Sequence, residues 1–105
     1  MNLRTKIIEK AMGLVNYDRQ KEYGTPLENF SNVAMRWSLT LSKKLKEPVS
    51  PRDVAMCMAD LKQSRMSFQF KEDSAVDAIG YTALAYELPD ELPVRYQQFF
   101  FNVDD

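Results

Sequence analysis

The sequence predicts an all-α fold, a four-helix bundle-like single domain followed by an aromatic C-terminal tail. Two observations predict it: helix-start signals recur along the chain, and apolar residues follow each of them at helical spacing. A length of 105 residues is typical of one domain with one hydrophobic core. We therefore expect a helical domain over residues 1–93 and a tail over 94–105.

The first helix is expected from about Leu3 to about Arg19. Its apolar residues recur at intervals that suit an amphipathic helix; they are Ile7, Ile8, Ala11, Met12, Leu14 and Val15. Gly13 interrupts the pattern, because glycine disfavours a helix interior.

The next two helices begin with the same device: a hydroxyl cap, a proline at the first position and an acid at the third. Thr25-Pro26-Leu27-Glu28 starts one and Ser50-Pro51-Arg52-Asp53 starts the other. The expected buried stripes are Phe30, Val33, Ala34, Trp37, Leu41 and Leu45, then Val54, Met58 and Leu61. Each stripe repeats at three or four residues and should face the core.

A further helix is expected from Ser74, with Asp77 as its third-position acid and no proline. Its apolar positions are Ile79, Ala83, Leu84 and Leu88. Beyond the Pro89 and Pro93 region lies a tail with three consecutive phenylalanines, Phe99–Phe101. This tail either packs back on its own domain or contributes to an interface, because such a cluster is poorly solvated.

Composition excludes several classes of protein. The chain has no histidine, which removes the commonest general base and zinc ligand. A net charge of −1 disfavours broad nucleic-acid binding. Apolar runs are too short for a membrane span, and charges occupy the N-terminus where a secretory signal would be apolar, so we expect a cytoplasmic protein. The single cysteine, Cys57, lies among apolar residues and is expected to be buried and inert.

Acidic side chains remain as candidate ligands for a divalent metal. Asp73 and Asp77 are four residues apart, so they project from one face if both are helical. Asp77 is equally explained as a capping acid, and Asp73 is favoured by the helix dipole. The same two readings apply to Glu28 and Asp53, each of which lies in a capping position of its own helix.

Cationic side chains are the second candidate set. Lys62 and Arg65 are three residues apart and share a helix face, where they either clamp a phosphate or form solvated surface. Gly80 lies inside an expected helix, which indicates close backbone contact with a neighbouring helix or a ligand.

Three blocks of residues carry a family resemblance. They are Asp18–Gly24 with Glu28-Asn29-Phe30 and Trp37; Asp53-Val54-Ala55 with Leu61-Lys62 and Arg65; and Asp73-Ser74 with Asp77 and Gly80-Tyr81. Over roughly residues 14–88 the chain resembles a family of short proteins encoded largely by phages and prophages. That family brings no assigned activity with it.

A looser similarity runs to the all-α nucleotide pyrophosphohydrolases of the MazG and dimeric dUTPase type, in which acids from neighbouring helices hold magnesium. The resemblance implies a MazG-like architecture, a homo-oligomer, and Asp73 and Asp77 as the later acidic pair. The earlier Glu-x-x-Glu element is missing, and Glu22 and Glu28 are the nearest substitutes.

Two kinds of function follow as expectations. The first is binding of a nucleotide or another phosphate ligand, either with Mg²⁺-dependent pyrophosphohydrolysis or by sequestration without catalysis. Mg²⁺ would bind Asp73, Asp77 and Glu28, and the ligand would contact Lys62, Arg65, Tyr23 and Tyr81. The alternative is an accessory protein that inhibits a host defence protein through the aromatic tail.

Overall fold

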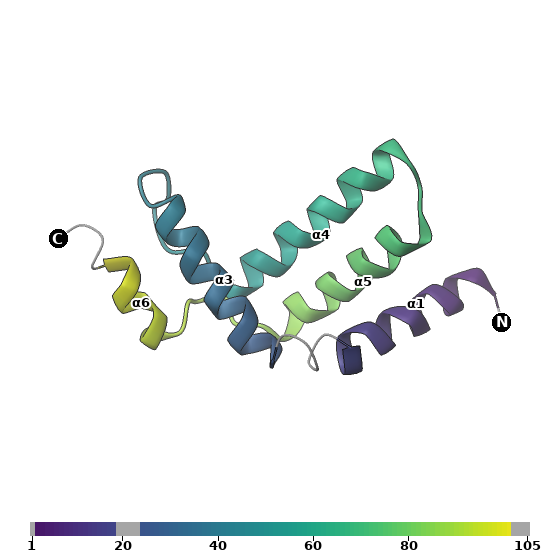
Figure 1. Ribbon diagram of the computed structural model, residues 1–105, viewed down its shortest axis with the longest axis horizontal. Helices are drawn as coiled ribbons and strands as arrows, with labels where there is room; N and C mark the ends of the chain where they lie inside the picture. Colours follow the sequence, from purple (N-terminus) through teal and green to yellow (C-terminus); the bar gives the residue numbers. More distant parts are fainter. Residues whose placement is uncertain (1, 19–23, 102–105) are drawn as a thin grey trace.

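The fold is all-helical, as the sequence predicts (Figure 1). The computed structural model describes residues 2–18 and 24–101, and within them there is no strand. The helices in chain order are α1 (Leu3–Gly13), a π-helical turn η1 (Leu14–Asp18), α3 (Pro26–Thr40), α4 (Pro51–Phe68), α5 (Glu72–Glu87) and α6 (Val94–Phe101). The first expected helix therefore changes to wider π-helical turns immediately after Gly13.

The centre of the fold is a hairpin of α4 and α5, joined by a short connection at residues 69–71 (Figure 1). α1 lies along α5 on the side away from α4, and α3 crosses the other end of α4 at a large angle. The molecule measures 56 × 29 × 20 Å, so it is elongated along one axis.

Local signals place the starts of α3 and α4. The Oγ of Ser50 accepts a hydrogen bond from the amide of Asp53 at 3.0 Å, and the Asp53 carboxylate accepts one from the amide of Ser50 at 2.9 Å. The predicted reciprocal capping box is therefore confirmed. At α3 the hydroxyl of Thr25 accepts from the amide of Glu28 at 3.2 Å.

Ser38 ties the connection after α3 to that helix. Its buried hydroxyl donates to the carbonyl of Ala34 at 2.7 Å and accepts from the amide of Val49 at 2.8 Å. This contact brings the chain back along α3 and delivers Ser50 to the start of α4.

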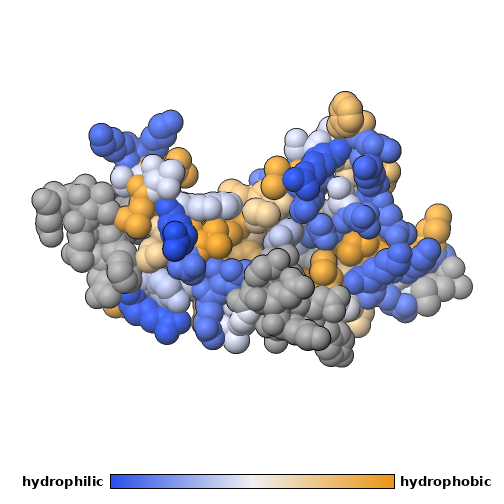
Figure 2. Space-filling view, viewed as in Figure 1, coloured by the Kyte–Doolittle hydropathy of each residue, from blue (hydrophilic) through white to orange (hydrophobic). Residues whose placement is uncertain are grey.

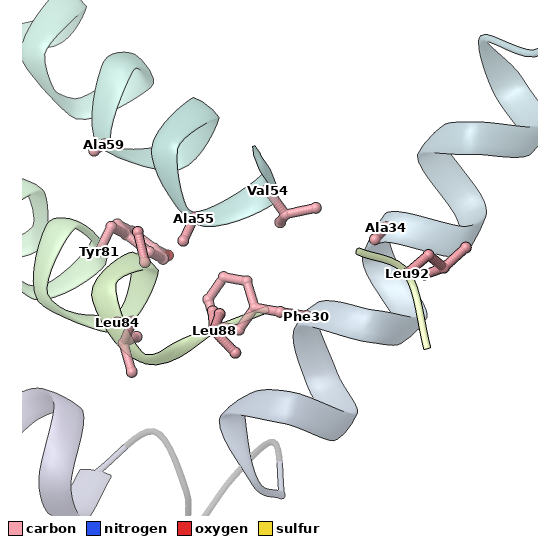
Figure 3. Packing of buried hydrophobic residues seen from close by; sticks show 10 residues of the cluster. Phe30, Ala34, Val54, Ala55, Ala59, Tyr81, Leu84, Leu88 and Leu92 are labelled. Carbon is pink, nitrogen blue, oxygen red and sulfur yellow. The ribbon is translucent and has the colours of Figure 1, made fainter. Parts of the chain in front are cut away.

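The core lies where α3 meets the hairpin (Figure 3). The ring of Phe30 meets the ring of Tyr81 edge-on, with centroids 6.2 Å apart and planes at 79°. Around this pair pack Ala34, Val54, Ala55, Ala59, Leu84, Ala85, Leu88 and Leu92. Several of these side chains are alanines, so the helices approach closely but each contributes little apolar area.

Several residues that the helical spacing predicted to face the core do not do so. Leu41, Leu61 and Ile79 are exposed rather than buried. Ala83 is exposed as well. On α5 the expected residues are exposed because the helix carries apolar residues on two faces. Its contacts with α4, α1 and η1 bury the face that holds Gly80 and Leu84. Figure 2 shows apolar surface interspersed with polar surface, not a fully polar exterior.

The expected tail contains a helix, α6, that packs against α3. Tyr96 is partly buried against the core, and the side-chain amide of Gln97 donates to the carbonyl of Leu92 at 2.6 Å. At Tyr96 the tail therefore packs back on its own domain. The side chains of Phe99–Phe101 lie outside those that the structure describes.

Candidate ligand site

Lys62 and Asp77 meet across the hairpin. The Nζ of Lys62 on α4 lies 3.1 Å from a carboxylate oxygen of Asp77 on α5. Their side chains are 16% and 29% exposed, so the pair is partly shielded from water. The sequence predicted both residues for one site, and the structure brings these two together as an ion pair.

The predicted start of α5 at Ser74 is wrong. The helix begins at Glu72 with Lys71 in the cap position, and no side chain caps its first amides. The carboxylate of Glu72 instead bonds Lys10 of α1, with Lys6 close by at 3.9 Å. This contact between distant segments accompanies a helix that begins three residues earlier than a Ser74 cap implies, at Glu72 instead of Ala75. Asp77 therefore lies in the second turn and is not a capping acid.

A pocket of about 360 Å³ lies at this end of the hairpin. It is lined by Arg65, Phe68, Gln69, Lys71 and Ser74. We call it the hairpin pocket. Of these residues, Arg65 was predicted as a phosphate ligand. Lys71 was missed because a helix start at Ser74 leaves it in a loop of no particular geometry, and Phe68 was missed as well.

The first turn of α5 gives the hairpin pocket a mixed electrostatic character. Amide groups at a helix start favour an anion, and Lys71 and Arg65 add two full positive charges. Glu72 is engaged by lysines of α1, and their hydrogen bond and charge hold the pKa of its carboxyl below its usual range. Asp73 is exposed in the same turn and carries the opposing negative charge.

Glu28 and Tyr81, also predicted as ligands, do not line this pocket. Glu28 accepts a hydrogen bond from the Thr25 hydroxyl at 3.1 Å, which makes it part of the α3 cap. Tyr81 is buried in the core against Phe30. Tyr23, predicted as a ligand, and Glu22 lie outside the described residues. Over residues 2–18 and 24–101, no three acidic or thiol side chains gather closely enough to hold a metal ion.

Gly80 permits close contact between helices. A Cβ built at Gly80 would lie 3.0 Å from Cγ1 of Val15 in η1, tighter than nearly all such contacts in proteins. Of the two contacts predicted for Gly80, with a neighbouring helix or with a ligand, the contact with a neighbouring helix is therefore present. It sets how near the N-terminal segment lies to α5.

Cys57 is exposed on α4, so the expectation of a buried thiol is wrong. Its apolar neighbours in sequence do not share its face, because successive residues of a helix point in different directions. Partial desolvation, together with the charges of Asp60 and Asp53, raises the pKa of the thiol.

None of the described helices combines the length and the apolar content that a bilayer crossing requires.

The chain is similar to two phage proteins. It is 34% identical over 86 residues to the Gene 55 protein of Mycobacterium phage D29 and 31% identical over 88 residues to the Gene 55 protein of Mycobacterium phage L5. Each alignment covers 81% of this chain and 54% of the phage protein, so the chain spans about half the length of these relatives. No solved structure matches it.

Residues 6–89 match the model of a domain of unknown function, DUF6378. This range begins inside α1, includes α3, α4 and α5, and ends before α6. The expected likeness to phage proteins is confirmed by the two relatives. The chain therefore belongs to the DUF6378 family.

Proposed function

We propose that this protein binds a phosphate-bearing small molecule of the nucleotide class in the hairpin pocket and holds it without catalysis. The observation that carries the proposal is the lining of that pocket, where Arg65 and Lys71 meet the uncapped start of α5. Two cations beside free helix amides form a favourable environment for a phosphate.

Each lining group has a distinct part in such binding. The planar guanidinium of Arg65 can bond two phosphate oxygens, and the ammonium of Lys71 contributes a point charge. Ser74 supplies a hydroxyl donor in the first turn. Phe68 is 94% exposed at the rim, where an aromatic ring can stack on a base.

The Lys62–Asp77 pair has a supporting part. Its short interhelical contact fixes α4 against α5 one turn from the pocket. Because the ammonium of Lys62 is already engaged by a carboxylate, Arg65 and Lys71 are the better phosphate ligands.

Sequestration is the version that the geometry supports best. Hydrolysis of a nucleoside triphosphate would need Mg²⁺ on a group of acids such as Asp73, Asp77 and Glu28. Glu28 is engaged in the α3 cap and Asp77 in an ion pair, which weakens that donor set. The Mg²⁺-dependent enzyme of MazG type therefore stays a hypothesis that the same experiment tests.

Calorimetric titration tests the proposal with deoxynucleoside triphosphates, cyclic dinucleotides and ADP-ribose, each with and without Mg²⁺. We expect one class to bind, and Arg65→Gln with Lys71→Gln to weaken its binding at least about tenfold, the loss of a charged hydrogen bond. Lys44→Gln with Lys46→Gln removes the same charge from the exposed turn after α3 and should leave affinity unchanged.

The outcomes separate the candidate functions. Absence of binding by the whole panel overturns the proposal and leaves host-protein inhibition through residues 94–105 as the surviving expectation. Binding that both double variants retain also overturns it, because the ligand would then lie elsewhere. Conversion of the ligand during incubation with Mg²⁺ would replace sequestration by the enzyme.

A further inference from the structure

A second hollow runs along the hairpin between α4 and α5. It has a volume of about 640 Å³, and none of its lining side chains carries a charge. We call it the apolar groove; Met66, Phe70, Ala75, Ile79, Ala83 and Tyr86 are among the residues that line it. A further hollow, lined by Met56 and by the charged Arg52 among others, shares Thr82 and Tyr86 with it and lies toward the start of α4. Neither hollow shares a lining residue with the hairpin pocket.

The composition of α5 indicates that this groove is covered. Residues 78–86 carry no charged side chain, although one side of that stretch faces outward. Phe70 is 84% exposed and Tyr86 is 89% exposed, one at each end of the groove. A helix that is apolar on two faces is typical of an element buried on both.

We propose that the apolar groove is the interface of a homodimer, in which the α4–α5 hairpins of two copies pack face to face as a four-helix bundle. A two-fold arrangement makes the groove its own partner. Two antiparallel helices from each copy then supply four helices around one shared core.

The surface area of the chain supports a second copy of the chain as the occupant of the apolar groove. The accessible surface is 7,511 Å², whereas a compact monomer of this mass exposes about 6,100 Å². The radius of gyration is 15.3 Å, against about 13 Å for a compact domain of this length. The excess surface, of the order of 1,400 Å² per chain, lies in the range that obligate homodimers bury.

The shape of the groove is self-complementary. Large side chains, Phe70 and Tyr86, project at its two ends, and small ones, among them Ala75, Ala78 and Ala83, line the α5 side between them. In a two-fold pairing with antiparallel helices, the Phe70 end of one copy comes to lie over the Tyr86 end of the other, and the small residues of the two copies face each other. Small residues that face each other let the two α5 helices approach closely.

Light scattering coupled to size-exclusion chromatography tests the proposal with the full chain over a concentration series. We expect a mass of about twice the 12.2 kDa of one chain. Ala83→Glu, at an exposed position, should weaken the dimer at least about 100-fold, because each interface would bury unpaired carboxylates. Circular dichroism should show that the variant keeps its helices.

Leu41→Glu is the matched control, since Leu41 is also exposed and apolar but lies at the end of α3. A monomer at every concentration overturns the proposal, as does a dimer that Ala83→Glu preserves or Leu41→Glu dissociates. Because the groove and the hairpin pocket share no lining residue, loss of the dimer with intact ligand binding would separate this proposal from the proposed function.

Discussion

Lys62 of α4 and Asp77 of α5 form an ion pair of 3.1 Å that joins the two long helices next to the hairpin pocket. Both side chains are partly shielded from water, so removal of one leaves the other without its partner in a drier setting. The pair therefore links the stability of the hairpin to the geometry of the proposed site.

A double-mutant cycle tests this link. Lys62→Met and Asp77→Asn should each lower the free energy of unfolding by about 1–2 kcal/mol, the contribution of a charged hydrogen bond. The double variant should lose little more than the worse single variant. Urea denaturation measures all three. Additive losses would contradict the pair.

Gly80→Ala should destabilise the protein although alanine favours helices. The added methyl meets Val15 at 3.0 Å, and a β-branched valine has little freedom to move away. We expect a net loss of about 1 kcal/mol in thermal or urea unfolding.

Two controls accompany this variant. Gly13→Ala meets no atom within 4 Å, so it should stabilise α1. In a Val15→Ala background Gly80→Ala should become neutral or stabilising. A Gly80→Ala protein that is more stable than the parent would show that η1 does not lie against α5.

Ser50→Ala should cost about 1–2 kcal/mol of unfolding free energy, because Ser50 caps α4 and its buried hydroxyl also donates to Asp90 at 3.0 Å. Ser74→Ala should be nearly neutral, since Ser74 lies inside α5 and does not cap it. Comparison of the two by chemical denaturation decides where α5 begins. An equal loss at both positions would place the helix start at Ser74.

Glu72→Gln should destabilise the protein near neutral pH and have no effect in acid. The lysines of α1, chiefly Lys10, lower the pKa of Glu72 in the folded state, so the folded protein favours the ionised form. This contribution is present above the pKa of the unfolded chain and is lost as the pH falls through the lower pKa of the folded one. Melting temperatures over that range measure it, with Glu9→Gln, an exposed glutamate of α1, as control. A difference that persists unchanged in acid would contradict the contact.

Cys57 should react with a thiol reagent in the folded protein, because it is exposed. Desolvation and the charges of Asp60 and Asp53 raise the pKa of this thiol, so the thiolate forms at a higher pH than in a free cysteine. The alkylation rate should therefore rise with pH, with a midpoint above that of a free cysteine. Alkylation rates against pH, with a model thiol as reference, measure this. A thiol that reacts only after denaturation would show that Cys57 is buried, as the sequence predicts.

The starts of α3 and α4 could be predicted from sequence because their signals are local. A hydroxyl, a proline and an acid within four residues fix the cap wherever the helix lies in the fold. The start of α5 could not, because Glu72 is held by Lys10, a residue 62 positions away. No local pattern reports such a contact.

Which residues of α5 are buried could not be predicted from the sequence either. Its apolar residues follow helical spacing on two faces, and periodicity does not say which face meets α4 and η1. The site was predicted in part for the same reason. Lys62, Arg65 and Asp77 follow from spacing, but Lys71 joins Arg65 only through the actual geometry of the turn between α4 and α5.

The most direct test of the proposed function is a crystal structure of the protein with a bound nucleotide from the calorimetric panel. We expect a phosphate oxygen within hydrogen-bond distance of the Arg65 guanidinium and the Lys71 ammonium, at the first turn of α5. A phosphate bound at any other surface, with Arg65 and Lys71 in solvent, would contradict the account.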